Sequence, residues 1–177
     1  NIDRVFGIKS PRKNGHGVVE TIKAMAEGEV KVFIGLGGNF AVATPDTPYT
    51  EAGLRRCNLT VQIATKLNRS HLVCGKEALL LPCLGRTEID IQLHGAQAVS
   101  VEDSMSNVHL SAGRNEPASE NLLSEPDIVA RMAAAVLPES DIKWQWYVES
   151  YDRIRDSIED VFDEFHDFNA RVYQPGG

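Results

Sequence analysis

The chain has 177 residues, of which 42% are hydrophobic and 24% charged, an ordinary composition for a globular domain with its own core. Its net charge of −7 argues against a general nucleic-acid-binding function, which needs a basic surface to replace phosphate counterions. No apolar stretch approaches the roughly 20 residues needed to cross a bilayer, and the polar first residues contain no export signal core. We expect a chain that binds neither nucleic acid nor a membrane.

The cysteines and histidines show no metal-binding pattern. Cys57, Cys74 and Cys83 lie too far apart for a C-x-x-C motif, and an odd number without paired spacing is typical of a reducing compartment. The five histidines lack the i, i+4 spacing of a helical metal pair. We therefore predict a cytoplasmic protein without metal ligands. No initiator Met is present, and we expect a piece of a longer polypeptide.

The first half of the chain alternates predicted helices and strands. An irregular lead-in over residues 1–16 precedes a helix over 18–26, which Gly28 ends, and a strand over 30–34. A turn over 43–48 leads into a short helix over 50–56, with Thr47 or Thr50 as its N-cap. Strands follow over 58–64 and 77–82, with a helical turn through Leu72 and Val73 between them. This alternation predicts a parallel sheet with helical crossovers.

The pattern changes after Cys83. Alternating residues over 89–93 and 98–101 predict a hairpin or a pair of edge strands, and 108–121 resembles a loop. Ser124 and Pro126 predict the start of a helix at Glu125. The last helix is predicted to be the longest, with an apolar stripe from Tyr151 to Phe168 and acids opposite. We predict a single Rossmann-like, three-layer α/β domain over 1–177, on which a helical segment over 140–177 packs.

A glycine-rich turn follows the first predicted strand. Three glycines fill four positions in Gly35-Leu36-Gly37-Gly38, and Asn39 follows them. Open α/β sheets bind ligands where such strands end, because glycine lets a ligand approach the backbone. The spacing is not the G-x-G-x-x-G fingerprint, so a plain tight turn explains it at least as well.

Three successive predicted strands end in segments that could hold an anionic ligand: Gly35–Asn39, Thr65–Ser70 and Cys83–Glu88. If the strands are parallel neighbours, these segments meet at one edge of the sheet. Lys66, Arg69 and Arg86 could bind phosphates, while Asn39 and Asn68 could bind a base or a sugar. The alternative is that these segments are solvated loops. No hydrolase triad is evident, since Ser104 has no adjacent base, and a structural role explains the Cys83 thiol.

Several of these segments resemble the large subunits of molybdopterin oxidoreductases. Gly35-Leu36-Gly37-Gly38-Asn39-Phe40, followed by Pro45-Asp46, is similar to their "GxNP…PD" stretch. The runs from Thr65 to His71 and from Leu79 to Glu88 resemble the strand and "A-D-V-V-L-P" segments that follow it. The similarity covers most of the chain and is greatest to formate dehydrogenase-like alpha subunits.

The resemblance implies an α/β domain that holds the guanosine diphosphate end of one of two molybdopterin guanine dinucleotides. The cofactor-binding residues it implies, together with those at the strand ends, are Gly35, Gly37, Gly38, Asn39, Thr65, Lys66, Asn68, Arg69, Ser70, Arg86, Asp103 and Ser104. One departure is that Val61-Gln62-Ile63-Ala64 lacks the acidic residue with which many members read guanine. Thr65 or Asn68 could take over that contact.

The resemblance places the molybdenum ligand and the iron–sulfur cysteines outside this stretch. It implies a molybdenum oxidoreductase, with formate as a candidate substrate, whose remaining domains are the partners of this one. The isolated chain is then expected to be catalytically silent and to hold no tightly bound cofactor. Two alternatives are a non-catalytic interaction module that uses the acidic terminal helix and, less well supported, a free-standing NAD-binding domain.

Overall fold

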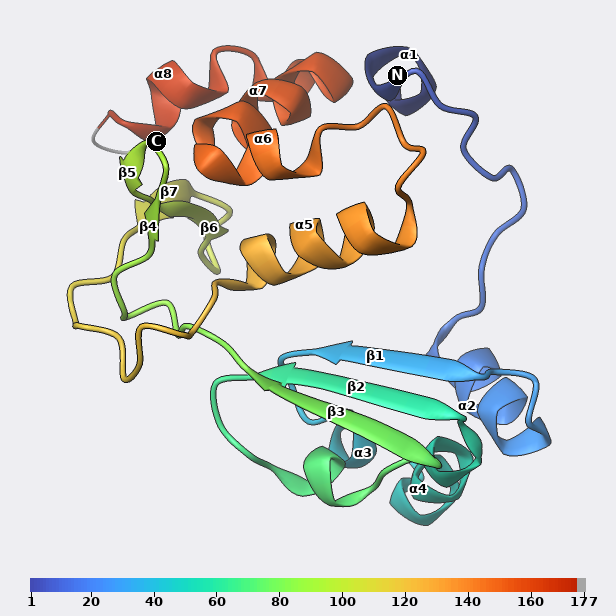
Figure 1. Cartoon of the computed structure of the whole chain (residues 1–177). Helices are drawn as coiled ribbons and strands as arrows, with labels where there is room; N and C mark the ends of the chain where they lie inside the picture. Colours follow the sequence, from blue (N-terminus) through green and yellow to red (C-terminus); the bar gives the residue numbers. More distant parts are fainter. Residues whose placement is uncertain (175–177) are drawn as a thin grey trace. The chain divides into compact units, whose positions relative to one another are not determined.

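The computed structural model describes residues 1–174, which form two compact units (Figure 1). Unit 2 comprises residues 12–83, and unit 1 comprises residues 1–11 and, as far as described, 84–174. Unit 2 contains a parallel sheet, whereas unit 1 contains two antiparallel strand pairs and the helices of the C-terminal half. Throughout residues 1–174, no helix has the length and apolar character that a membrane crossing requires.

Unit 2 is built from three parallel strands and the helices that connect them. The strands are β1 (Val32–Leu36), β2 (Leu59–Ala64) and β3 (Glu77–Pro82), in the order β1-β2-β3. In the register of the sheet, Ile34 of β1 is opposite Val61 of β2, which is opposite Leu79 of β3. The helices are α2 (Val18–Glu27), α3 (Phe40–Ala43), α4 (Thr47–Arg56) and the 3₁₀ turn η1 (Arg69–Leu72). The predicted α/β class with a parallel sheet is confirmed.

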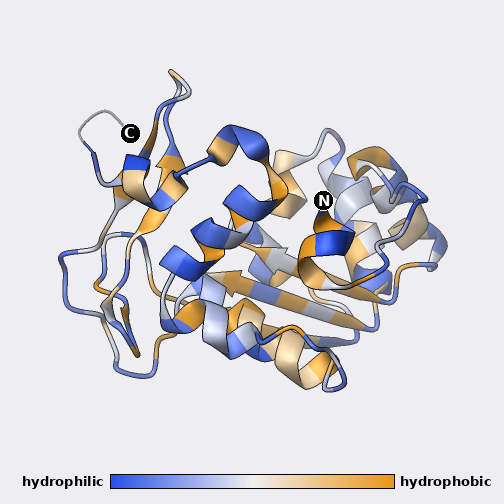
Figure 2. Cartoon of the chain, turned by 90° about the horizontal axis from the view of Figure 1, so that it is seen from above, coloured by the Kyte–Doolittle hydropathy of each residue, from blue (hydrophilic) through white to orange (hydrophobic). Residues whose placement is uncertain are grey.

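The core of unit 2 lies between the sheet and its helices. Helices α2, α3 and α4 cover one face of the sheet, and hydrophobic residues run along the strands (Figures 1 and 2). Phe33 of β1 points to this face and packs, with Phe40, against buried Met25 and Leu54. Each such buried side chain contributes about 1.5–3 kcal/mol of transfer free energy. Val32, Ile34 and Leu36 alternate with Phe33 and lie on the opposite face.

Two predicted boundaries in unit 2 are shifted. The predicted strand over 30–34 begins at Val32, because the amides of Glu29 and Val30 close the end of α2 by donating to Ala24 O at 2.9 and 3.4 Å. Helix α4 starts at Thr47, and its N-cap is Asp46, whose carboxylate accepts the Tyr49 amide at 3.0 Å. The predicted caps Thr47 and Thr50 are wrong. The short helix α3 was not predicted.

Unit 1 contains short elements joined by long connections. Its strands are β4 (Ile91–Gln92), β5 (Gly95–Ala96), β6 (Val99–Glu102) and β7 (Val108–Ser111). Its helical elements are α1 (Ile2–Phe6), α5 (Glu125–Val136), α6 (Trp144–Glu149), α7 (Asp152–Val161), η2 (Asp163–Phe165) and α8 (Phe168–Val172). As predicted, Ser124 caps α5, and its hydroxyl accepts the Asp127 amide at 3.4 Å.

The strand pairing in unit 1 differs from the prediction. Residues 89–93 and 98–101 do not pair with each other: β4 pairs with β5, and β6 pairs with β7. The β6–β7 turn is closed by the Asp103 carboxylate, which accepts the amides of Met105 and Asn107 at 2.8 and 3.1 Å. The predicted loop over 108–121 therefore begins with a strand. The Asp103 carboxylate stabilises a tight turn, which brings residues 108–111 back alongside β6. The lead-in also contains a helix, α1.

The predicted long terminal helix is interrupted. Phe162 is extended (φ −124°, ψ 110°) and Asp167 is left-handed (φ 55°), so the segment divides into α7, η2 and α8. The apolar stripe still packs in part, since Val161 and Phe168 are buried. Phe162 is 50% exposed, and its ring lies against that of Phe165, with the ring centroids 6.3 Å apart. The longest helix among residues 1–174 is α5, with 12 residues.

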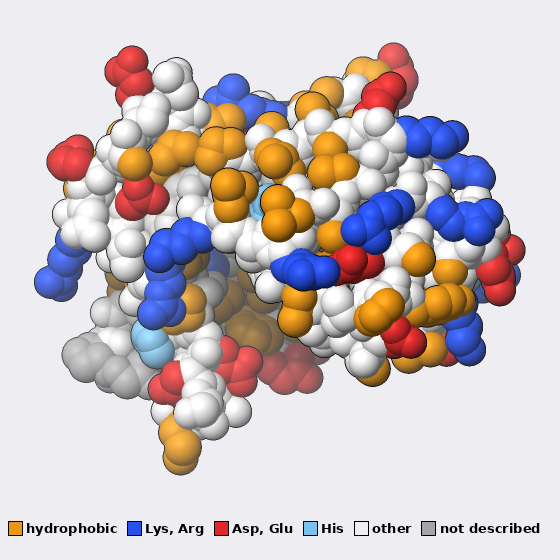
Figure 3. Space-filling model, turned by 90° about the horizontal axis from the view of Figure 1, so that it is seen from below, with side chains coloured by type: hydrophobic (Ala, Val, Ile, Leu, Met, Phe, Trp, Pro, Cys, Tyr) orange, Lys and Arg blue, Asp and Glu red, His pale blue; other side chains and the backbone are white. Residues whose placement is uncertain are grey.

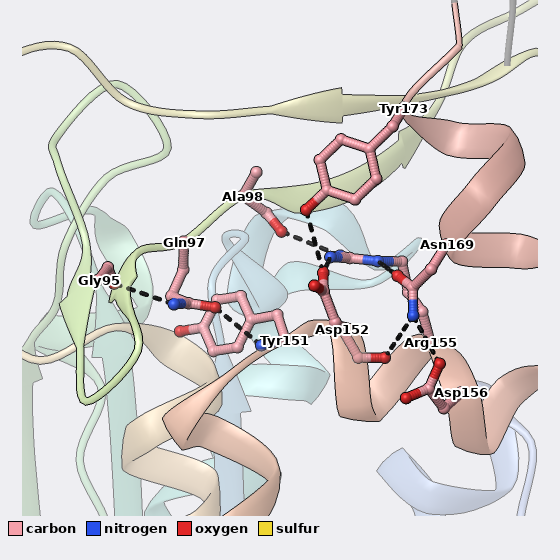
Figure 4. Close-up of polar contacts among 9 residues, drawn as sticks. All are labelled: Gly95, Gln97, Ala98, Tyr151, Asp152, Arg155, Asp156, Asn169 and Tyr173. Atoms are coloured by element: carbon pink, nitrogen blue, oxygen red, sulfur yellow. Dashed lines mark hydrogen bonds and ion pairs between the residues drawn. The ribbon is translucent and has the colours of Figure 1, made fainter.

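A buried arginine joins the pieces of this interrupted segment (Figure 4). The Arg155 side chain is only 4% exposed and forms an ion pair with Asp152 one turn earlier. Its guanidinium also donates to Asn169 Oδ1 at 2.6 Å and to the carbonyl of Ala98 at 3.0 Å. Arg155 thus links α7 to α8 and to the residue before β6.

Candidate functional site

The glycine turn after β1 adopts a conformation that only glycine reaches easily. Gly37 and Gly38 are both left-handed, with φ of 65° and 68°. The amide of Gly37 donates to Ile63 O of β2 at 2.7 Å, which holds the turn against the neighbouring strand. A side chain at Gly38 would meet no atom within 4 Å. The backbone of the turn is therefore open to a ligand.

The segment after β2 is bonded to the glycine turn. Asn68 Nδ2 donates to Gly38 O at 2.7 Å, and Ser70 Oγ donates to Asn39 Oδ1 at 3.1 Å. The buried Ser70 hydroxyl also accepts the amide of Ala41 at 2.9 Å. Two of the three predicted strand-end segments thus lie side by side at the carboxyl edge of the sheet.

The second segment is shaped by a capping box. Asn68 begins η1: its Oδ1 accepts the Ser70 amide at 3.0 Å, while its own amide donates to His71 Nδ1 at 3.0 Å. The side chains of Asn68 and Ser70, both proposed as ligand contacts, are therefore engaged in holding the two loops together. They preorganise the edge, whereas Thr65 and Lys66 are exposed beside it.

Arg69 is engaged with an acid on α4. Its Nε donates to Glu51 Oε1 at 2.7 Å, and Arg55 donates to the other carboxylate oxygen at 3.2 Å. The Arg69 hydrogen bond is the main reason that the pKa of Glu51 is lowered, and Glu51 correspondingly raises the pKa of Arg69. The Glu51 side chain is only 9% exposed, although Arg69 is 58% exposed. Arg69 can therefore face a ligand while it is held from behind.

We expect unit 2 to lose stability at acidic pH, because protonation of Glu51 breaks its ion pair with Arg69. Since folding lowers the pKa of Glu51 below its ordinary value of 4.5, the stabilisation by this carboxylate is complete above that pH and is lost as the pH falls through the folded pKa. Urea unfolding of the parent chain and of Glu51→Gln should differ at pH 7 and converge toward pH 3. The exposed Glu29→Gln should follow the parent at every pH. A constant difference between Glu51→Gln and the parent would contradict this assignment.

A cavity of about 220 Å³ opens next to these loops, beneath the carboxyl ends of β2 and β3. Its walls include Gln62, Lys66, Leu67, His71, Leu80 and Pro82. On this side of unit 2, hydrophobic side chains lie among Lys and Arg (Figure 3). Gln62 is only 5% exposed, and its Nε2 has no hydrogen-bond partner among the described residues.

Gln62 was not among the predicted ligand contacts. The available signal was a lone amide in the middle of a buried strand, where unpaired polar groups are costly. Gly35 lies next to Gln62, and a side chain there would clash with it, because a Cβ at Gly35 would lie 2.6 Å from Gln62 Oε1. Gly35 therefore provides space for the amide, a different role from that of Gly37 and Gly38 in the turn.

The remaining predicted residues belong to unit 1. Arg86 is exposed there, and Ser104 lies in the β6–β7 turn. Asp103 closes that turn, and the backbone N–H groups of Asn107 and Met105 lower its pKa. Cys83 still belongs to unit 2, where its amide lies 3.4 Å from Ala64 O, but the chain enters unit 1 at Leu84. The edge described in unit 2 thus consists of the first two segments.

The chain resembles proteins that are much longer. It is 52% identical over 177 residues to an uncharacterized oxidoreductase of Mycobacterium tuberculosis and to one of Mycobacterium bovis. It is 47% identical over 172 residues to the protein YdeP of Escherichia coli. The chain spans 23% of the length of each of these relatives. No family model matches the chain, and no group of three or more metal-ligating side chains occurs within residues 1–174.

Proposed function

We propose that the chain is the molybdopterin guanine dinucleotide-binding domain of a molybdenum-dependent, formate dehydrogenase-like oxidoreductase. The observation that carries the proposal is the joined pair of loops at the carboxyl edge of a parallel sheet, where α/β folds bind nucleotides. The similarity to a much longer protein named as an oxidoreductase supports it. Catalysis then belongs to the whole polypeptide, whose other domains are the partners of this chain.

The residues at this edge fit the nucleotide part of such a cofactor. Gly37 and Gly38 present backbone without side chains, and Gly38 has open space where its Cβ would stand. Lys66 and Arg69 supply positive charge for a diphosphate, and Arg69 is oriented by Glu51. The cavity beneath β2 and β3 has mainly apolar walls with one buried amide, a combination that suits a flat base.

When bound in the parent enzyme, the molybdenum cofactor supplies the redox chemistry. The contribution of this chain is binding and orientation. The Asn68–Gly38 and Ser70–Asn39 hydrogen bonds keep the two loops in place before the ligand arrives, which reduces the entropy lost on binding. No described residue of this edge is assigned a proton-transfer step.

We expect the 177-residue chain to bind GDP with a Kd on the order of 1 mM or tighter, since one diphosphate and one base provide few contacts. Arg69→Ala should weaken binding about tenfold by removing a charge-assisted hydrogen bond to phosphate. Asn39→Ala should weaken it to a similar extent by freeing Ser70 and loosening the second loop. Isothermal titration calorimetry measures both effects.

Arg55→Ala is the matched control. Like Arg69, Arg55 donates to Glu51, but it does so from within helix α4. Its removal perturbs the same carboxylate and leaves the second loop unchanged, so GDP affinity should stay within about twofold of the parent. Equal loss of affinity in both variants would mean that Arg69 acts only through Glu51. Absence of GDP binding by the parent chain would count against the proposed function.

A further inference from the structure

Among the described residues, two buried side-chain nitrogens have no hydrogen-bond partner, those of Gln62 and Trp144, and only Gln62 lines the cavity beside the two loops. It lies in the middle of β2, between two hydrogen-bonded strands, and is 5% exposed. Its Nε2 carries two hydrogen-bond donors and has no partner among the described residues. A buried amide without a partner destabilises the fold, so an apolar residue of the same size would make a more stable strand.

The surroundings of Gln62 form a pocket for a flat ligand. Leu67, Leu80 and Pro82 supply apolar wall surface, and Lys66 adds a cation in the adjoining loop. At about 220 Å³, the cavity can accept one heterocyclic ring system. Leu67 is 78% exposed, so this part of the cavity wall can adapt to a ligand.

The cavity also lies next to the loops assigned to the nucleotide. Thr65, Lys66 and Leu67, which line it, belong to the segment whose next residue, Asn68, holds the glycine turn. His71, another wall residue, accepts the amide of Asn68. A ligand whose phosphates contact Gly37 and Gly38 could thus place its base in this cavity.

We propose that Gln62 is the specificity-determining residue for the base, and that it selects a 6-oxopurine. The inference rests on the proposed function and names its base contact. The Nε2 group donates to the exocyclic oxygen of guanine or hypoxanthine. Adenine presents an amino group at the same position, and because Gln62 Oε1 is turned toward Gly35, two donors would oppose each other without an acceptor.

The test is a titration of the 177-residue chain and Gln62→Met with GDP, IDP and ADP. Methionine has a similar length and keeps the cavity wall but removes the donors. The parent chain should bind GDP and IDP equally within about twofold, because both have the 6-oxo group, and ADP about tenfold more weakly. Gln62→Met should lose this preference by weakening GDP and IDP binding about tenfold, with ADP unchanged. Its melting temperature should equal or exceed that of the parent.

Two controls make the outcomes distinct. Gln97→Met removes an amide that is engaged in unit 1, with Gly95 O and the Tyr151 amide, and should leave the GDP to ADP ratio unchanged. In the parent chain, the Gln62 side-chain amide resonances should shift with GDP and IDP but not with ADP, a readout that does not depend on how the variant folds. GDP binding with an undiminished preference in Gln62→Met, or amide resonances that GDP does not move, would overturn the assignment of Gln62 alone. Absence of any GDP binding by the parent would overturn the proposed function together with it.

Discussion

Arg155→Met should destabilise unit 1 by about 2–4 kcal/mol. Methionine retains the aliphatic stem but removes the hydrogen bonds to Asn169 and Ala98 and the ion pair with Asp152. The cost falls below that of a fully buried ion pair because Asp152 is 47% exposed and can be solvated by water. Chemical denaturation followed by circular dichroism measures the change in unfolding free energy.

Arg171→Met provides the comparison on the neighbouring helix α8. Arg171 is exposed and donates to the carbonyls of Glu164 and His166 at 3.3 and 3.2 Å, where water can replace it. This variant should remain within about 0.5 kcal/mol of the parent. Arg155→Lys should recover only part of the loss, because an ammonium group cannot reproduce the planar fork of the guanidinium. If Arg155→Met unfolded like Arg171→Met, Arg155 would not link α7 to α8.

Gly113→Ala should also destabilise unit 1, by about 3 kcal/mol, the upper end of overpacking costs. Residues near Gly113 run beside Thr87–Ile89: Asn115 donates to Thr87 O at 2.9 Å, and Ile89 donates to Asn115 O at 2.8 Å. A Cβ at Gly113 would lie 1.8 Å from the backbone oxygen of Glu88. The Glu88 carbonyl oxygen is held in place by the hydrogen bonds on either side of it, so it cannot move away from the added methyl group as a flexible side chain could.

Gly15→Ala is the matched glycine control, because a Cβ at that position meets no atom within 4 Å. We expect its melting temperature to equal that of the parent, whereas Gly113→Ala should melt several degrees lower. The Glu88 carboxylate gives a second readout. It accepts the amides of Gly85 and Ala118, which lower its pKa, and a displaced segment should raise that pKa toward its ordinary range. An unchanged pKa and melting temperature would show that the two segments are not held this closely.

These effects concern the scaffold of unit 1, while the proposed ligand contacts lie in unit 2. Gln62 affects both stability and binding, since the amide that disfavours folding is also the one assigned to the base. A residue that costs stability and provides recognition is common at binding sites. The stability and affinity of Gln62→Met should therefore change in opposite directions.

The local pattern of the sequence was sufficient for most of unit 2. The apolar face of the helix over 18–26, its end at Gly28 and the β-branched strands specify elements that pack on one another, and the parallel sheet follows from their alternation. In unit 1, the pairing of β6 with β7 depends on the Asp103 carboxylate, and the break at Phe162 accompanies the hydrogen bond from Arg155 of α7 to Asn169 of α8. Periodicity does not report such interactions, so those predictions were wrong.

The same division applies to the candidate site. Because parallel strands end at one edge, the sequence by itself determined that Gly35–Asn39 and Thr65–Ser70 are neighbours. Only the tertiary structure decided what their side chains do: Asn68 and Ser70 hold the loops together, Glu51 orients Arg69, and Gln62 is left without a partner. The physical reason is that hydrogen-bond satisfaction depends on distances between segments, and these exist only after the chain has folded.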